Sequence, residues 1–282
     1  MKDNGVPQGL PSREQADEFR KAVLGHYRDK GRDFPWRRTR DPWRILVSEF
    51  MLQQTQTDRV VPRYEAWFLR FPDAASLATA SLADVYGQWK GLGYNSRALR
   101  LRDSARAVCS DFGGRVPDTE GELRSLPGVG PYTARAVLAF AFNRPTLVLE
   151  TNIRAALIFH FFPDAAVVTD RELEPVAMAV LDRDQPGRWY QALMDYGAWL
   201  KKREPNPSRK SAAYSRQSAF KGSLRQARGA ILRCLSDSGG GITLTMARDA
   251  SGLDYGRLER AAMALAAEGL VSYADGLVSF SA

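Results

Sequence analysis

The sequence predicts an all-α core made of two helical lobes, followed by a small winged-helix-like α+β domain at the C-terminus. Three observations support this fold class. Over residues 14–200, apolar residues recur at spacings of three and four, and β-type alternation is nearly absent. A glycine-rich turn interrupts the helical pattern near the middle of the chain. Close to the C-terminus, an Asp-Gly pair separates two short apolar runs, which indicates a hairpin.

Composition narrows the class of protein. Forty Lys and Arg against 32 Asp and Glu give the 282-residue chain a net charge of +8, which favours a polyanionic partner. No apolar run reaches the roughly 18 residues of a membrane span, and the N-terminus lacks the apolar stretch of a signal peptide. We therefore expect a cytoplasmic protein that does not bind membranes. Its two cysteines, Cys109 and Cys234, are too few for a disulfide framework or a four-thiolate metal site.

The core helices are placed by their start signals. Asp41 reads as an N-cap and Pro42 as the first helical residue of a helix over 43–55. Pro72-Asp73, Thr119 and Asp170 are candidate starts of further helices. We place the core at residues 1–205, a basic linker at 206–223 and the C-terminal domain at 224–282. Residues 201–233 hold ten Lys or Arg and one acid, so this stretch is either a solvated linker or a segment that follows phosphates.

The C-terminal domain is predicted from a run of short elements. A helix over 224–235, a break at Gly239–Gly241 and a strand over 242–244 come first. A short helix over 246–251, a longer one over 255–268 and a hairpin around Asp275-Gly276 follow. Helix, strand, helix, helix and hairpin is the order of a winged helix.

The central turn reads Leu126-Pro-Gly-Val-Gly130 and lies between two helical stretches. Its glycines allow a tight hairpin, and Pro131 opens the second helix with its first N–H groups pointing outward. Such a helix start can bind a DNA phosphate without reading sequence, through Gly128, Val129 and Gly130. The alternative is an ordinary turn between two helices.

Two carboxylates lie in contrasting sequence surroundings. Glu49 has Ile45, Leu46 and Leu52 at helical spacing, so burial should raise its pKa and suit it to act as a general acid. Alternatively, it is a structural glutamate in a hydrogen-bond network. Glu150 precedes a helical pattern that Thr151 or Asn152 can cap. The positive end of that helix should favour its ionised form, although it could equally be a plain capping-region acid. Such a pair is used to divide roles in cleavage at an anomeric carbon.

At these residues the chain resembles the helix-hairpin-helix (HhH-GPD) DNA glycosylases, and it is most similar to the MutY-type adenine glycosylases. The matching pieces occur in family order and cover about residues 20–200. They are Phe34–Trp36, Ser48–Gln56, Gly91–Ala98, Leu126–Ala134 and Tyr190–Ala198.

The resemblance implies a role for each matched residue. Glu49 would protonate the leaving purine, and Glu150, supported by Asn152, would stabilise the cationic sugar. Tyr132 stands where bifunctional relatives carry a Schiff-base lysine, so no lyase activity is expected. Gln53, Gln54 and Tyr94 would wedge into the duplex as the base flips out. The resemblance also assigns Arg32, Trp36 and Gln191 to the base pocket. The basic run that includes Lys201, Lys202 and Arg203 is expected to contact DNA in place of a loop of the family.

The chain departs from this family in three ways. Glu150 replaces the usual Asp, which adds one methylene at the reacting centre. The region after Ala198 has none of the four cysteines that the family usually places there, so we expect no [4Fe-4S] cluster and no other cofactor. The short C-terminal domain stands in place of a Nudix-like domain that senses 8-oxoguanine.

The sequence therefore predicts a monofunctional DNA N-glycosylase of base excision repair, with adenine opposite 8-oxoguanine or guanine as first substrate. One alternative is a thymine or uracil glycosylase acting opposite guanine, and another is a non-catalytic DNA damage-binding protein. The expected partner is double-stranded DNA containing a mismatch or lesion. We expect a nucleoid-associated monomer in which Glu49 and Glu150 face each other across a cavity.

Overall fold

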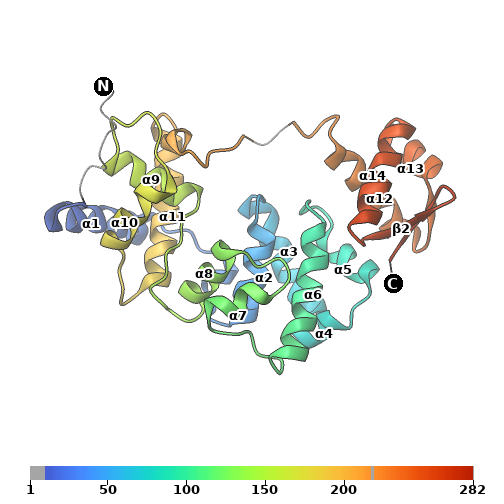
Figure 1. Ribbon diagram of the computed structural model, residues 1–282, viewed down its shortest axis with the longest axis horizontal. Helices are drawn as coiled ribbons and strands as arrows, with labels where there is room; N and C mark the ends of the chain where they lie inside the picture. The colour runs from blue at the N-terminus through green and yellow to red at the C-terminus, as the bar shows by residue number, and fades with distance from the viewer. Residues whose placement is uncertain (1–9, 217–218, 282) are drawn as a thin grey trace. The chain divides into compact units, whose positions relative to one another are not determined.

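The computed structural model describes residues 10–216 and 219–281 and divides the chain into two compact units (Figure 1). The first unit combines the N-terminal stretch up to Pro42 with Pro131–Arg216. The second combines Trp43–Gly130 with the C-terminal part of the chain, from residue 217 onward. Among the described residues, no helix is both long enough and apolar enough to cross a membrane.

The first unit is helical, and its core forms where α1, α9, α10 and α11 pack together. Phe19 of α1 lies edge-on to His160 and to Trp189, with ring centroids 4.9 and 6.0 Å apart. The elements of this unit are α1 (Arg13–Lys30), η1 (Pro35–Arg37), α8 (Pro131–Phe140), α9 (Thr151–Phe161), α10 (Asp170–Val180), α11 (Pro186–Arg203) and η2 (Pro207–Lys210).

The helical part of the second unit encloses Trp67, Phe71 and Trp89, which are almost fully buried. Asp73 and Ser76 form a reciprocal capping box at the start of α4, as the Asp73 signal predicted. The helices of this part are α2 (Pro42–Leu52), α3 (Thr57–Arg70), α4 (Ala74–Ala78), α5 (Leu82–Trp89), α6 (Ser96–Asp111) and α7 (Glu120–Ser125).

The C-terminal segment, residues 219–281, has the predicted order of elements. Three antiparallel strands form a sheet in the order β1-β3-β2, and Val278 pairs with both Ile242 and Tyr273. Asp275 and Gly276 turn the hairpin with φ values of 51° and 75°, which is why the Asp-Gly signal was informative. The elements are α12 (Leu224–Ser238), β1 (Ile242–Thr243), α13 (Leu244–Ser251), α14 (Tyr255–Ala267), β2 (Val271–Ala274) and β3 (Leu277–Phe280).

Helix α2 begins at Pro42 as predicted but ends at Leu52, three residues before the predicted Thr55. Gln54 has a φ of 54°, a left-handed conformation that no helix interior allows. The predicted end of the helix was wrong because none of the residues just after Leu52 is a helix breaker.

Candidate active site

Glu150 is itself the N-cap of α9, whereas the sequence pointed to Thr151 or Asn152. Its Oε1 accepts hydrogen bonds from the backbone N–H groups of Asn152 and Ile153, at 2.7 and 2.8 Å. Its Oε2 accepts one from the Asn152 side-chain amide at 3.0 Å. Three donors therefore fix the carboxylate, so its oxygens are held in one orientation at a helix N-terminus.

Helix α11 fixes the chain around Glu150 from two sides. The Tyr190 hydroxyl donates to the Thr146 carbonyl at 2.6 Å and accepts from the Val148 N–H at 3.2 Å, which holds the segment leading to Glu150. At Gly197 a β-carbon would lie 1.9 Å from the Asn152 carbonyl oxygen, so only glycine permits this approach of α11 to α9.

Burial raises the pKa of Glu150, while the N–H groups of Asn152 and Ile153 and the cations Lys201 and Arg154 act in the opposite sense. The sequence predicted that the helix N-terminus would favour the ionised form. That effect is present, but desolvation outweighs it, so the net direction is opposite to the prediction.

Lys201 lies one helical turn beyond Gly197 and interacts electrostatically with both Glu150 and Arg32. Burial lowers its pKa, although the Glu150 charge acts in the opposite sense. Its side chain is half-buried, whereas those of Lys202 and Arg203 are exposed. The pattern of charges in the sequence did not separate these three cations.

Arg154 links the start of α9 to α10. Its guanidinium forms a bidentate ion pair with Asp170, both distances being 2.7 Å. The hydrogen bond and charge of Asp170 raise the pKa of Arg154, and the charge of Glu150 contributes further. Tyr132, at the second position of α8, packs against the core of the same unit.

Asp195 of α11 is a second buried acid, and its role was not predicted from the sequence. Arg37 donates to both of its oxygens at 2.8 and 2.9 Å, and Arg32 donates through its backbone N–H and its Nε at 2.8 and 2.7 Å. Burial alone would raise the pKa of Asp195, but these hydrogen bonds and charges bring it below its usual value. The sequence did contain a signal for this acid, because Asp195 has Leu193 and Tyr196 as near neighbours in the chain. An acid among apolar residues was also the reason for singling out Glu49.

The three residues assigned to the base pocket lie in this unit. The guanidinium groups of Arg32 and Arg37 each lie 5.1 Å from the Phe34 ring centroid, and Phe34 stacks on Trp36 at 5.0 Å. The Gln191 side chain accepts a hydrogen bond from the Tyr27 hydroxyl at 3.0 Å. The N-terminal stretch and α11 therefore hold all three of them.

The second unit holds the remaining predicted residues. Glu49 is buried on α2, with a 7% exposed fraction, as its apolar neighbours indicated. Gln53 and Gln54 leave the end of α2, and Tyr94 ends the loop 91–94 with a φ of 46°. Left-handed non-glycine residues cost about 1–3 kcal/mol each and often mark functional sites.

Arg97 holds these two loops together, a role that was not predicted from the sequence. It is buried, and its guanidinium donates to the carbonyls of Phe50 and Met51 at 2.6 and 3.0 Å. The same group donates to the carbonyls of Leu92 and Gly93, at 3.2 and 3.0 Å, and to Thr55 Oγ1 at 2.9 Å. Burial lowers its pKa to about 10, so it stays charged at neutral pH.

The predicted hairpin spans residues 126–130, after α7 and before α8. Gly128 has a φ of 81°, and a β-carbon there would lie 2.9 Å from Arg100 Cβ and 3.0 Å from a Phe50 ring carbon. Val129 is buried, and the Pro127 carbonyl accepts a bond from the Ser104 hydroxyl at 2.6 Å. Residue 128 therefore has no room for a side chain, and the turn is tied to α6 through Ser104.

Residues 204–212, which follow α11, do not fit an iron–sulfur cluster. Such clusters take four cysteine thiolates, and the whole chain has two cysteines, both outside this region. Pro207 and Ser208 are buried instead, and Val168 exchanges backbone hydrogen bonds with Lys210 and Ala212, both at 2.8 Å. This part of the chain is anchored by its own backbone.

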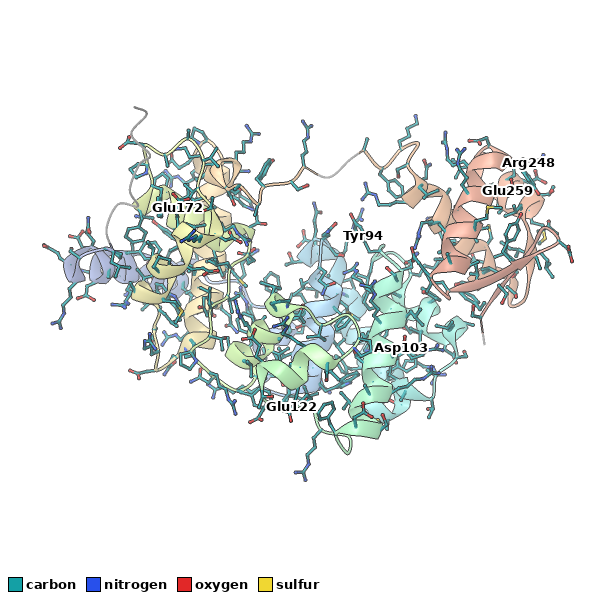
Figure 2. The ribbon with its side chains drawn as sticks, in the orientation of Figure 1. Tyr94, Asp103, Glu122, Glu172, Arg248 and Glu259 are labelled. Carbon is teal, nitrogen blue, oxygen red and sulfur yellow. The ribbon has the colours of Figure 1, made fainter. Side chains whose placement is uncertain are left out.

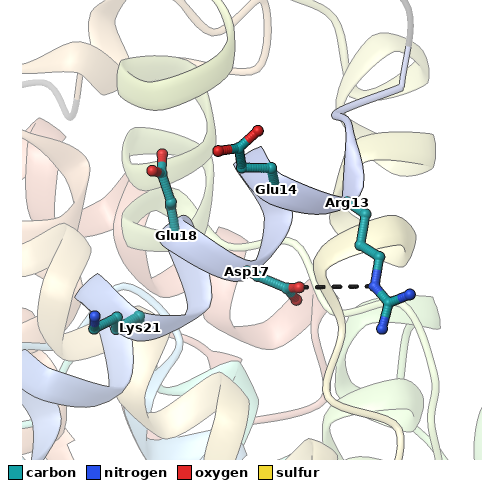
Figure 3. A pocket seen from close by; sticks show the side chains of 5 residues that line it. All are labelled: Arg13, Glu14, Asp17, Glu18 and Lys21. Atoms are coloured by element: carbon teal, nitrogen blue, oxygen red, sulfur yellow. Dashed lines mark ion pairs between the residues drawn. The ribbon is translucent and has the colours of Figure 1, made fainter.

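A surface depression on α1 is a poor alternative site. It is lined by five charged side chains, three acidic and two basic, and Arg13 lies 3.9 Å from Asp17 (Figure 3). It holds no nucleophile or acid shielded from water. Within 10–216 and 219–281, no three His, Cys, Asp or Glu side chains are grouped so that they could hold a metal ion.

Comparison with known proteins shows the family of the chain. Residues 47–178 match the HhH-GPD superfamily of base excision DNA repair proteins. The adenine DNA glycosylase of Mycolicibacterium smegmatis is 37% identical over 274 residues, which cover 90% of this chain and 93% of that protein. The chain belongs to the MutY-type adenine DNA glycosylase family. The human adenine DNA glycosylase is 38% identical over 193 residues, covering 64% of this chain and 35% of the human protein.

Solved structures share the fold of this family member. A thermostable thymine-DNA glycosylase aligns with a TM-score of 0.60 and 28% identity, covering 66% of this chain and 88% of that one. A trapped endonuclease III–DNA covalent intermediate aligns with a TM-score of 0.57 and 18% identity over 67% of this chain and 88% of that chain, which shows a common fold.

Proposed function

We propose that this DNA N-glycosylase removes adenine opposite 8-oxoguanine or guanine from double-stranded DNA. The observation that carries the proposal is the Glu150 carboxylate, fixed by three N–H donors at the start of α9 and paired electrostatically with Lys201. Cleavage of a glycosidic bond leaves a cationic sugar, which a fixed negative group stabilises. The names of the relatives support adenine as the base.

The proposed reaction uses two carboxyl groups. The protonated Glu49 donates its proton to a ring nitrogen of adenine, and the bonding pair between C1′ and N9 moves to the base. The Glu150 carboxylate stabilises the resulting oxocarbenium ion. Water then adds to C1′, and its proton passes to a carboxylate. The products are free adenine and an abasic site.

Tyr132 supports a monofunctional reaction. Strand cleavage by β-elimination in bifunctional glycosylases passes through an imine with a lysine amine, which a phenol cannot form. We expect the abasic strand to break only when hot alkali is added. Breakage by the protein alone, in the absence of alkali, would overturn this part of the proposal.

A panel of defined duplexes tests the substrate. We expect release of adenine opposite 8-oxoguanine and guanine but not opposite thymine, and loss of release in Glu49→Gln and Glu150→Gln. The second candidate is removal of thymine or uracil opposite guanine, which the likeness to a thymine-DNA glycosylase favours. Cutting at G·T with none at adenine would select it. No release from any duplex would indicate a damage-binding protein.

The remaining proposals concern the fold of the C-terminal segment, the oligomeric state and the iron–sulfur cluster. The C-terminal segment has the element order of a winged helix, and we assign it that fold. We propose that the protein binds mismatch-containing DNA as a monomer and holds no iron–sulfur cluster. Iron analysis of protein purified without oxygen tests the last point, since stoichiometric iron would contradict it. Sedimentation with and without duplex DNA tests the oligomeric state.

A further inference from the structure

Two guanidinium groups that are far apart in the sequence lie close to the ring of Tyr94, which is labelled in Figure 2. Arg97 Cζ and Arg225 Cζ are each 5.6 Å from the centroid of its ring. Arg225 Nη1 also donates a hydrogen bond to the Tyr94 hydroxyl at 3.0 Å. Cations over a ring attract its π-face, so the hydroxyl and the ring are both restrained.

The second of these cations belongs to the C-terminal segment. Arg225 is in the first turn of α12, whose N-cap is Ser223. Helix α12 packs against α5 in the same unit, and Lys90 Nζ lies 2.7 Å from Asp237 Oδ1. Arg225 therefore reaches Tyr94 from an anchored helix.

A second path joins the C-terminal segment to the chain beside Tyr94. Phe280 of β3 stacks on Tyr86, with centroids 5.4 Å apart and planes 10° from parallel. The Tyr86 hydroxyl donates to the carbonyl of Asn95, the next residue after Tyr94, at 3.0 Å. The segment thus holds both the side chain of Tyr94 and the backbone that follows it.

We propose that the C-terminal segment positions Tyr94 for insertion into the duplex, with Arg225 as the positioning residue. This inference rests on the proposed function and on the role that the family resemblance gives Tyr94, which would wedge into the duplex as the base flips out. A ring that is ordered before DNA binds loses less conformational freedom on insertion. The segment thereby contributes to base extrusion without needing to read the DNA sequence.

The test measures extrusion directly, with 2-aminopurine next to the target adenine and stopped-flow fluorescence. In Arg225→Ala we expect the extrusion phase to slow about three- to tenfold, the effect of releasing one ordered side chain. Tyr94→Phe keeps the ring but removes the hydroxyl, and it should slow the same phase. The double variant should be no slower than the slower single variant, since both remove the same contact.

Arg248→Ala is the matched control. Arg248 is an exposed arginine of the same segment, paired with Asp249, and Figure 2 shows it well away from Tyr94. It should leave extrusion at the wild-type rate. Tyr94→Phe provides an independent test should Arg225→Ala prove unstable in thermal unfolding.

Wild-type extrusion rates in both single variants would overturn the inference. A second pair of results would also overturn it. These are additive slowing in the double variant and, in Arg225→Ala, a salt dependence of DNA binding that is smaller by about one counterion. Together they would mean that Arg225 contacts only phosphate. If the wild-type protein releases no adenine, the proposed function itself fails, and the two failures are thereby distinguished.

Discussion

A β-carbon added at Gly197 would stand 1.9 Å from the carbonyl oxygen of Asn152, far inside contact distance. Helices α9 and α11 can therefore keep their spacing only while residue 197 has no side chain. Because Asn152 supplies two of the three donors to Glu150, the spacing of the helices and the position of the carboxylate are linked.

Gly197→Ala should therefore damage both stability and catalysis. We expect unfolding to be easier by about 1–3 kcal/mol, as in other overpacked cores. A shift of the carboxylate by about 1 Å should reduce the rate of adenine release about 100-fold. Thermal unfolding and single-turnover assays measure the two effects. Gly25→Ala is the matched control, since no atom lies within 4 Å of a β-carbon at that helical position, and it should be neutral or stabilising.

Substitutions at Glu150 should separate capping from catalysis. Aspartate is a good N-cap, so Glu150→Asp should keep the unfolding temperature while its shorter side chain lowers the rate of adenine release. Glu150→Gln removes the negative charge and should lower that rate by at least about 100-fold. An Asp variant that is faster than wild type would show that the added methylene is a defect in this chain.

The acidic limb of the pH–rate profile should respond to Lys201. Burial raises the pKa of Glu150, so its active, ionised form is lost as pH falls through a value above that of an ordinary glutamate. Lys201 opposes this shift, and Lys201→Met should raise the pKa further and move the acidic limb to higher pH. Lys202→Met, at an exposed position, is the control. Superimposable profiles would contradict the role given to Lys201.

Asp195→Asn should destabilise the first unit strongly. Its carboxylate, with a side chain 1% exposed, balances Arg37, which is 9% exposed. Removing one partner of a buried ion pair costs about 3–5 kcal/mol. The folded-state pKa of Asp195 is lowered, so the pair stabilises the protein above the pKa of an unfolded aspartate and loses that contribution as pH falls below it. Asp33→Asn breaks an exposed pair with Arg38 and should leave chemical denaturation unchanged.

Helix starts and turns that depend on a few neighbouring residues could be predicted from the sequence. The start of α2 at Pro42, the turn at Asp275-Gly276 and the glycine requirement at Gly128 were all visible in the residues themselves. The end of α2 was not, because the carbonyls of Phe50 and Met51 are satisfied by a side chain more than 40 residues away. Such distant partners leave no periodic trace in the sequence.

Part of the candidate site could also be predicted from the sequence, and part of it could not. The family motifs contained Glu49 and Tyr132, Glu150 stood where the family usually has Asp, and the structure confirms that Glu49 is buried. The cluster of Arg32, Arg37 and Asp195 depends on the N-terminal stretch packing against α11, so spacing alone could not reveal it. Capping by Glu150 is a local contact, and the sequence had already offered the role of a capping-region acid. The net direction of the Glu150 pKa shift was missed because burial around a helix start is a tertiary property.

Arg97 couples the local unfolding of the loops 53–55 and 91–94. One guanidinium satisfies acceptors in both, so neither loop can unfold locally without exposing groups that the other also needs. Native-state hydrogen exchange should then show the amides of both loops becoming accessible in a single cooperative opening, with equal free energies and an equal response to denaturant.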